Sequence, residues 1–178
     1  QPLLQRKPVP QLLVQELTRA TGQPFAQYLS ERLWKRLGAA DAQVAPECCL
    51  RARQGDLIRV GALLASDGLY EASQVVPAGW IPQLVAARYP LEPGEPFDPQ
   101  RAGEPYAARD VFFLGRLSKN RLWLVPSLRL AVLRTGEGRA GDADWDDAMI
   151  PNLVIRGTRD FRPPSGTPTD LKSLVPNH

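Results

Sequence analysis

The stretch that most constrains the fold is FFLGRLSKNRLWLVPSLRLAVLRT, at residues 112–135. Three apolar runs follow one another closely here: Val111–Leu117, Arg121–Val125 and Leu128–Leu133. Short runs rich in branched and aromatic residues are typical of β-strands. The breaks between them, Ser118-Lys119-Asn120 and Pro126-Ser127, are too short for a parallel crossover. The sequence therefore predicts three consecutive antiparallel strands in a meander.

The middle run is apolar at every position from Leu122 to Val125. Successive side chains of a strand point to opposite faces of its sheet, so both faces of this strand need cover. We expect a central strand, covered by helices that come before and after it in the chain.

Apolar residues recur at helical spacing in several other segments, and glycines stand where helices would end. The predicted helices span residues 11–21, 25–37, 56–65 and 78–87, with a last one around Trp145, Ala148 and Met149. Within the third helix, Gly61 marks a place where another element approaches closely. Together with the meander, these segments predict an α/β (α+β) fold with helices packed on an antiparallel sheet.

The remaining segments show no clear period. Residues 1–10 carry three prolines and are expected to form an extended segment. Residues 39–53 are expected to be a loop with a short extended piece. Residues 89–106 are rich in proline, glycine and glutamate, and loops of this length in a compact domain are often functional or mobile. Residues 158–178 carry four prolines and little to bury, which predicts a disordered tail after a domain of residues 11–157.

The composition is that of an ordinary globular protein, with 43% hydrophobic and 23% charged residues in a chain of 178. No apolar run approaches the roughly 18–20 residues of a membrane span. The net charge of +3 is not gathered into basic runs with interleaved aromatics, which argues against a nucleic-acid partner. The only histidine is His178 and the two cysteines, Cys48 and Cys49, are adjacent, so we expect no metal site and no cofactor.

Four phrases, in this order, are similar to one known family. They are ELTRATGQPFAQYLSERLWKRLGA, ARQGDLIRVGALLASDGLYEASQVVPAGWI, NRLWLVPSLRLAVLRTG and WDDAMIPNLV. The chain resembles, over residues 11–157, the C-terminal portion of bacterial serine hydrolases of the class C β-lactamase and penicillin-binding-protein-like superfamily. The resemblance implies a small-molecule acyl substrate, an ester, amide or β-lactam, hydrolysed through an acyl-enzyme.

The family's catalytic motifs are only partly matched. No SxxK nucleophile motif occurs in the 178 residues. The second motif would lie just before the first helix, where Gln5-Arg6-Lys7 stands in place of the expected tyrosine. The third motif, often KTG or HxG, would fall within Leu114–Lys119, which contains neither. We therefore expect the chain to be inactive alone.

Four residues at that third-motif position are the candidate site residues. Gly115 could serve as the motif's glycine, and Arg116 could hold a substrate carboxylate through its guanidinium fork, or be an ordinary surface arginine. Ser118 and Lys119 are the low-ranking catalytic candidates, since a Ser-Lys dyad needs a desolvated amine within reach of the hydroxyl. The alternative for this pair is a solvated turn.

A group of aspartates, Asp142, Asp144, Asp146 and Asp147, precedes the last predicted helix. It lacks the glycine and terminal glutamate of a calcium loop. We expect Asp144 to cap the helix, with Asp146 and Asp147 favoured by its positive end, and Pro151 to split or kink it.

Two hypotheses remain open at this point. The chain is part of a serine hydrolase whose N-terminal portion is missing, or it is a non-catalytic binding module derived from the same fold. In the first case, uncovered apolar surface predicts a dimer or association with that missing portion. The family is often periplasmic or secreted, but these residues show no signal peptide and leave the compartment unknown.

Overall fold

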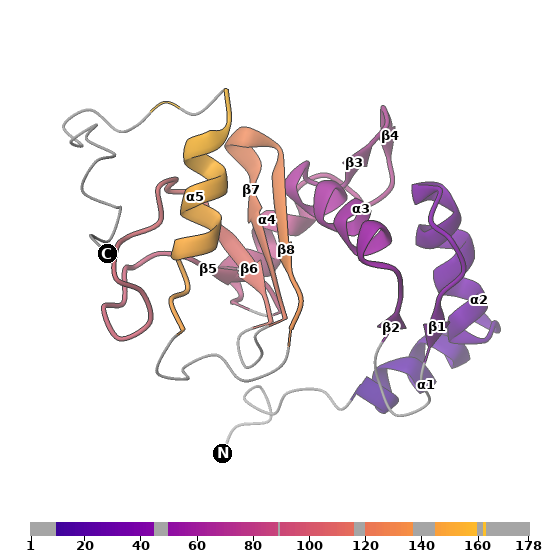
Figure 1. Ribbon diagram of the computed structural model, residues 1–178. Coiled ribbons are helices and arrows are strands. Elements are labelled where there is room, and N and C mark those ends of the chain that lie inside the picture. Colours follow the sequence, from indigo (N-terminus) through magenta and orange to yellow (C-terminus); the bar gives the residue numbers. More distant parts are fainter. Residues whose placement is uncertain are drawn as a thin grey trace, which may run out of the picture.

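The computed structural model describes residues 10–44, 50–88, 90–115, 120–136, 145–159 and 162. A pair of N-terminal helices is followed by two small hairpins around a longer helix, and then by a sheet between helices (Figure 1). The helices are α1 (Pro10–Thr21), α2 (Phe25–Leu29), α3 (Gln54–Ala65), α4 (Trp80–Ala86) and α5 (Met149–Gly157). The strands are β1 (Gln43–Val44), β2 (Leu50–Arg51), β3 (Leu69–Tyr70), β4 (Ser73–Gln74), β5 (Glu92–Pro93), β6 (Phe112–Leu114), β7 (Arg121–Val125) and β8 (Leu130–Arg134).

The main sheet has four antiparallel strands in the order β5-β6-β7-β8. β6, β7 and β8 form the predicted meander, with Trp123 of β7 opposite Phe113 of β6 and Val132 of β8. The α+β prediction is confirmed. The prediction of an entirely irregular loop at residues 89–106 is wrong at β5, which pairs with β6. Pro93 is tolerated there because β5 lies at the edge of the sheet.

β7 is buried along its whole length, as predicted. On one face, Leu122 and Leu124 pack with residues of α3 and α4 in one apolar cluster. On the other face, Trp123 and Val125 pack with Ile155 of α5 in a second cluster. In Figure 1 the sheet accordingly lies between α5 and α4, with α3 beside β8. The cover comes from helices before and after the strand in the chain.

Gly61 is the point of closest approach between α3 and the sheet. A Cβ placed there would lie 2.8 Å from the Ala131 Cβ and 3.0 Å from a Leu122 methyl. A side chain at this position would force the helix away from β7 and β8. The predicted close approach is therefore confirmed.

The two N-terminal helical segments end where the glycines predicted them to end. Gly22 follows α1 with φ of +67°, and Gly38 closes the second segment with φ of +58°. This second segment, 25–37, is α-helical only at α2 and continues as a π turn and a 3-10 turn. The Trp34 indole donates a hydrogen bond to the Ala40 carbonyl, which anchors the exit of the chain (2.5 Å).

The last helix begins later than predicted. α5 follows Ala148, and Asp146 supports this start, because its Oδ1 accepts hydrogen bonds from the N–H groups of Ala148 (2.8 Å) and Met149 (3.0 Å). Pro151 does not split the helix, so that prediction is wrong. It is the third residue of α5, where the missing N–H has no intrahelical acceptor to lose.

Several predictions fall outside the described residues, including those for residues 1–9, Cys48, Cys49, Asp142, Asp144 and most of the tail. Within the described ranges, no helix combines the length and the apolar character that crossing a bilayer requires.

Candidate functional site

Gly115 lies directly after β6, at the start of the connection to β7. Its φ of +98° is a conformation that side chains disfavour, and a Cβ there would overlap the Asn120 carbonyl oxygen. The glycine is thus required by the backbone itself. The other third-motif candidates, Arg116, Ser118 and Lys119, lie outside the described residues, so their roles stay predictions.

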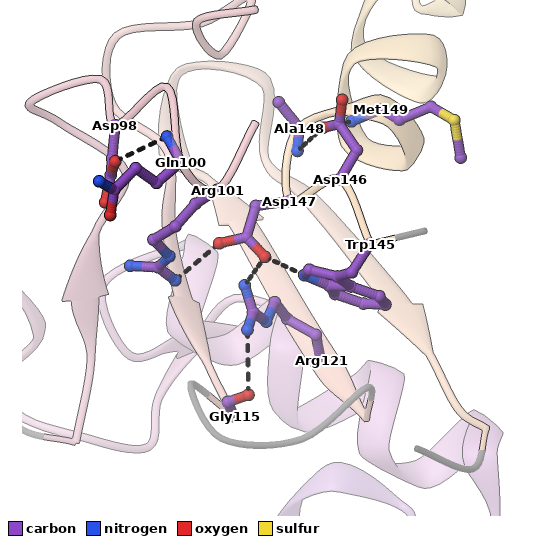
Figure 2. A network of polar contacts seen from close by, with 10 residues as sticks. All are labelled: Asp98, Gln100, Arg101, Gly115, Arg121, Trp145, Asp146, Asp147, Ala148 and Met149. Atoms are coloured by element: carbon purple, nitrogen blue, oxygen red, sulfur yellow. Dashed lines mark hydrogen bonds and ion pairs between the residues drawn. The ribbon is translucent and has the colours of Figure 1, made fainter. Parts of the chain in front are cut away.

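Arg121, the first residue of β7, has a side chain with no exposed surface. One guanidinium nitrogen forms an ion pair with Asp147 Oδ1 at 2.5 Å, and the other donates to the Gly115 carbonyl at 3.4 Å (Figure 2). Arg121 therefore ties the end of β6 to the segment before α5.

Aromatic rings surround the buried Arg121 guanidinium. Its central carbon lies 4.7 Å from the centre of the Phe113 ring, 5.3 Å from that of Trp145 and 5.9 Å from that of Trp123. The faces of aromatic rings attract cations, and more strongly where water is excluded. The rings and the carboxylate together replace the water that this cation has lost.

Asp147 is the centre of the polar network in Figure 2. Its Oδ1 forms the ion pair with Arg121 and accepts a hydrogen bond from the indole N–H of Trp145. Its Oδ2 forms a second ion pair, with Arg101, at 2.6 Å. Asp147 lies just before α5, as expected, and its carboxylate is engaged by these three side chains. One buried carboxylate between two guanidiniums leaves the group with a net charge of +1, and removal of the carboxylate would leave a buried cation uncompensated.

Polar side chains at and along α5 hold the stretch after β5 in place. Asn152, which is fully buried, accepts a hydrogen bond from the Ala107 N–H (2.7 Å) and donates to the Pro105 carbonyl (2.9 Å). Arg156 forms a two-pronged pair with Glu104 at 2.9 and 2.6 Å. This hydrogen-bonded pair lowers the pKa of Glu104 below its ordinary value.

Two hollows flank this stretch. A recess of about 40 Å³ is lined by Gly94, Phe97, Arg101, Tyr106, Phe113 and Asp147, among others. It has room for only a few water molecules. A larger hollow of about 400 Å³ shares Phe97 and Arg101 with the recess and adds Arg88, Glu92 and Glu95. The second volume lies within the usual range for small-ligand sites, and the first lies far below it.

Tyr106 lines the recess together with Arg101 and Asp147 of the charged network. Burial, and then the negative charge of Asp147, raise the pKa of its hydroxyl to about 12. No described residue forms a hydrogen bond of good geometry with that oxygen. A hydroxyl with a raised pKa stays protonated at neutral pH, which argues against Tyr106 as a general base.

The described residues offer no Ser-Lys pair. Lys35 is their only lysine, and it lies exposed at the end of the second helical segment. Ser127 is bonded to Asp110, through its N–H (2.6 Å) and its hydroxyl (2.9 Å), as part of the turn after β7. Among the described residues, no cluster of histidine, cysteine or carboxylate side chains could hold a metal ion.

Comparisons with known proteins give a match at the level of structure only. Neither the protein-family models nor the curated proteins match this chain. Among solved structures, the crystal structure of a β-lactamase (Mb2281c) from Mycobacterium bovis matches with a TM-score of 0.59 and 17% identity. The fold is β-lactamase-like. The match covers 83% of this chain and 61% of the other, so this chain spans less than two thirds of that β-lactamase.

The charged network of this β-lactamase-like fold was not predicted from the sequence. Arg121 and Asp147 are 26 positions apart, and no local pattern links them. One signal was present. Arg121 opens a strand that was predicted to be covered on both faces, and a charged residue there needs a buried partner.

Proposed function

We propose that this chain is the C-terminal part of a serine hydrolase domain of the class C β-lactamase and penicillin-binding-protein-like superfamily. The complete domain would hydrolyse an ester, amide or β-lactam through an acyl-enzyme. The 178 residues alone would not catalyse this reaction, because they contain no SxxK motif.

The observation that carries the proposal is the β-lactamase-like fold together with the place of Gly115 in it. Gly115 lies directly after β6, the strand on which the family resemblance puts the third motif, and its backbone conformation favours glycine. The fold match supports the architecture, and the quoted sequence phrases supply the finer family assignment.

Two features support the idea that further polypeptide completes the domain. β8 pairs only with β7 among the described strands, and its five residues contain no proline to discourage another strand. On α1, Leu12 and Leu13 are 56% and 51% exposed. Both features are places where the remainder of such a domain would pack.

The alternative is a non-catalytic module that keeps the packing of the fold. The small volume of the recess and the lack of a Ser-Lys pair among the described residues favour it. In this case the chain acts through a binding surface.

The deciding experiment has two parts. The intact mass and the encoded sequence of the natural product are determined, and its active serine is sought by activity-based labelling. The natural product and the 178-residue chain are each incubated with a fluorophosphonate probe, nitrocefin and p-nitrophenyl butyrate. Labelling of an upstream SxxK serine, with none in the 178-residue chain, supports the hydrolase. A natural product without SxxK that takes no label supports the non-catalytic module.

Stoichiometric labelling of the 178-residue chain would contradict both proposals. If turnover were also lost on Ser118→Ala, the chain would be a Ser-Lys hydrolase in its own right. The matched control is Ser127→Ala, which removes a described hydroxyl that serves a turn and leaves Ser118 in place.

A further inference from the structure

Among the described residues, one segment makes several long-range polar contacts with α5 and the residues just before it. We name residues 94–107 the strap. Asp146 Oδ2 accepts a hydrogen bond from the strap's Gly103 N–H at 2.9 Å, and the Asp147 N–H donates to the Arg101 carbonyl at 2.9 Å. The Asp147 carboxylate, Asn152 and Arg156 bind the strap through their side chains. The strap is thus held from one side by α5.

These contacts differ in depth along the strap. At the inner end, the fully buried Asn152 amide binds the backbone on either side of Tyr106. At the outer end, the Arg101 side chain is 34% exposed, and the Gly103 bond to Asp146 is open to solvent. Partly exposed polar contacts are screened by water and open more readily than buried ones. The outer half of the strap is therefore the half that can open first.

The outer half also lines both hollows. The recess and the larger hollow share Pro96, Phe97, Asp98 and Arg101 of the strap, and Pro93 of β5 next to it. Phe113 and Tyr106 line the recess but not the larger hollow, and the Arg101 guanidinium carbon lies 5.5 Å from the centre of the Phe113 ring. Since Arg101 lines both hollows, a displacement of its side chain changes the lining of both.

We propose that the strap is a gate and that the Arg101–Asp147 ion pair is its latch. With the latch closed, the recess admits only small molecules such as water. With the latch open, one continuous pocket exposes the Phe113 ring and the Tyr106 hydroxyl. Asp147 keeps Arg121 as a partner when Arg101 leaves, so opening does not strand the buried carboxylate. This inference does not depend on the proposed hydrolase function.

The test is amide hydrogen exchange, resolved by residue, in the full chain and in Arg101→Ala. Amides of the outer strap, Ala102 and Gly103, should exchange about tenfold faster, in line with the loss of one charge-assisted contact. The Ala107 amide, held by Asn152, and the amides of β7 should keep their rates. The matched control is Arg88→Ala, which removes an arginine from the wall of the same hollow without touching Asp147.

Equal exchange at Ala102 and Gly103 in the two variants would overturn the proposal. Faster exchange throughout β7 in Arg101→Ala would also overturn it, since the ion pair would then belong to the core. If Arg101→Ala does not fold, Arg101→Lys is measured instead, because lysine keeps a cation for Asp147 but loses the planar fork. In Arg101→Lys the proposal then requires faster exchange at Ala102 and Gly103, by less than in Arg101→Ala, and unchanged exchange at Ala107 and in β7.

Discussion

The two ends of this molecule are stabilised in different ways. At the sheet and α5, side chains meet across the sequence: Arg121 and Asp147 are 26 positions apart, and Glu104 and Arg156 are 52 apart. In the N-terminal helices, hydrogen-bonded side chains reach partners two to six positions away, as in Thr21 with Gln23 and Trp34 with Ala40. Figure 1 shows α1 and α2 on the far side of α3 from the sheet.

This difference indicates where each end obtains its stability. The sheet end has two apolar clusters and a buried charge network of its own. The helical end has local bonds and exposed leucines, and short helices in water depend on tertiary packing. We therefore expect the sheet end to respond strongly to single substitutions, and the helical end to respond mainly through association.

The largest effect is expected for Asp147→Ala. The substitution leaves the buried Arg121 guanidinium without its carboxylate, which should lower the free energy of unfolding by about 3–5 kcal/mol. Urea unfolding followed by tryptophan fluorescence measures it. Asp110→Ala, which removes an exposed turn carboxylate, is the control and should cost far less. Equal losses of unfolding free energy in the two variants would mean that the buried network stabilises the sheet end no more than the turn carboxylate does.

A smaller effect is expected where α3 meets the sheet. Gly61→Ala places a methyl 2.8 Å from Ala131 and should cost about 1–3 kcal/mol through overpacking. Gly55→Ala, in the same helix but with open space around it, should instead stabilise by up to about 1 kcal/mol. Thermal unfolding of both variants gives the comparison. A stabilising Gly61→Ala would contradict the close packing of α3 on β7 and β8.

The same contrast explains what could be predicted from the sequence. The burial of both faces of β7 and the close approach at Gly61 follow from local patterns. Apolar residues at every position of a strand require cover on both faces, and a lone glycine in a helix indicates close packing against a neighbour. The pairing of Arg121 with Asp147, and of Asn152 with the strap, is set by how distant segments meet in space. Periodicity carries no information about such pairs.

The candidate site was predictable to a lesser degree. The sequence indicates Gly115 as a motif glycine inside a strand of residues 111–117. The structure ends β6 at Leu114, and the backbone at Gly115 requires a glycine. The edge strand β5 went unnoticed, because two residues within a proline-rich stretch give no alternation to detect. Its hydrogen bonds to β6 come from the tertiary arrangement and not from the propensities of Glu92 and Pro93.

The pH dependence of the Glu104–Arg156 pair is a smaller effect at the sheet end. The bonded arginine lowers the pKa of Glu104 in the folded chain, so the stabilisation is complete above the ordinary glutamate value of 4.5 and is lost as the pH falls through the lower folded value. Since the pair is partly exposed, the contribution should stay below about 1 kcal/mol. Unfolding free energies from pH 6 down to pH 3 should fall less steeply in Glu104→Gln. Identical slopes would show that the pair does not couple α5 to the strap.

The smallest effect on stability, and the sharpest test of the helical end, is expected for Leu13→Glu on α1. An exposed side chain has little burial to lose, so the free energy of unfolding should change by no more than about 0.5 kcal/mol. If α1 is a surface that needs a partner, the wild-type chain should associate or bind an apolar dye, and Leu13→Glu should weaken both. Sedimentation velocity and dye fluorescence measure these effects, with Glu16→Lys on the same helix as the control for altered charge. A wild-type chain that sediments as a monomer and binds no dye would show that the helical end is complete as it stands. The contrast between the two ends would then reflect only the range of their contacts, and not a need for further polypeptide.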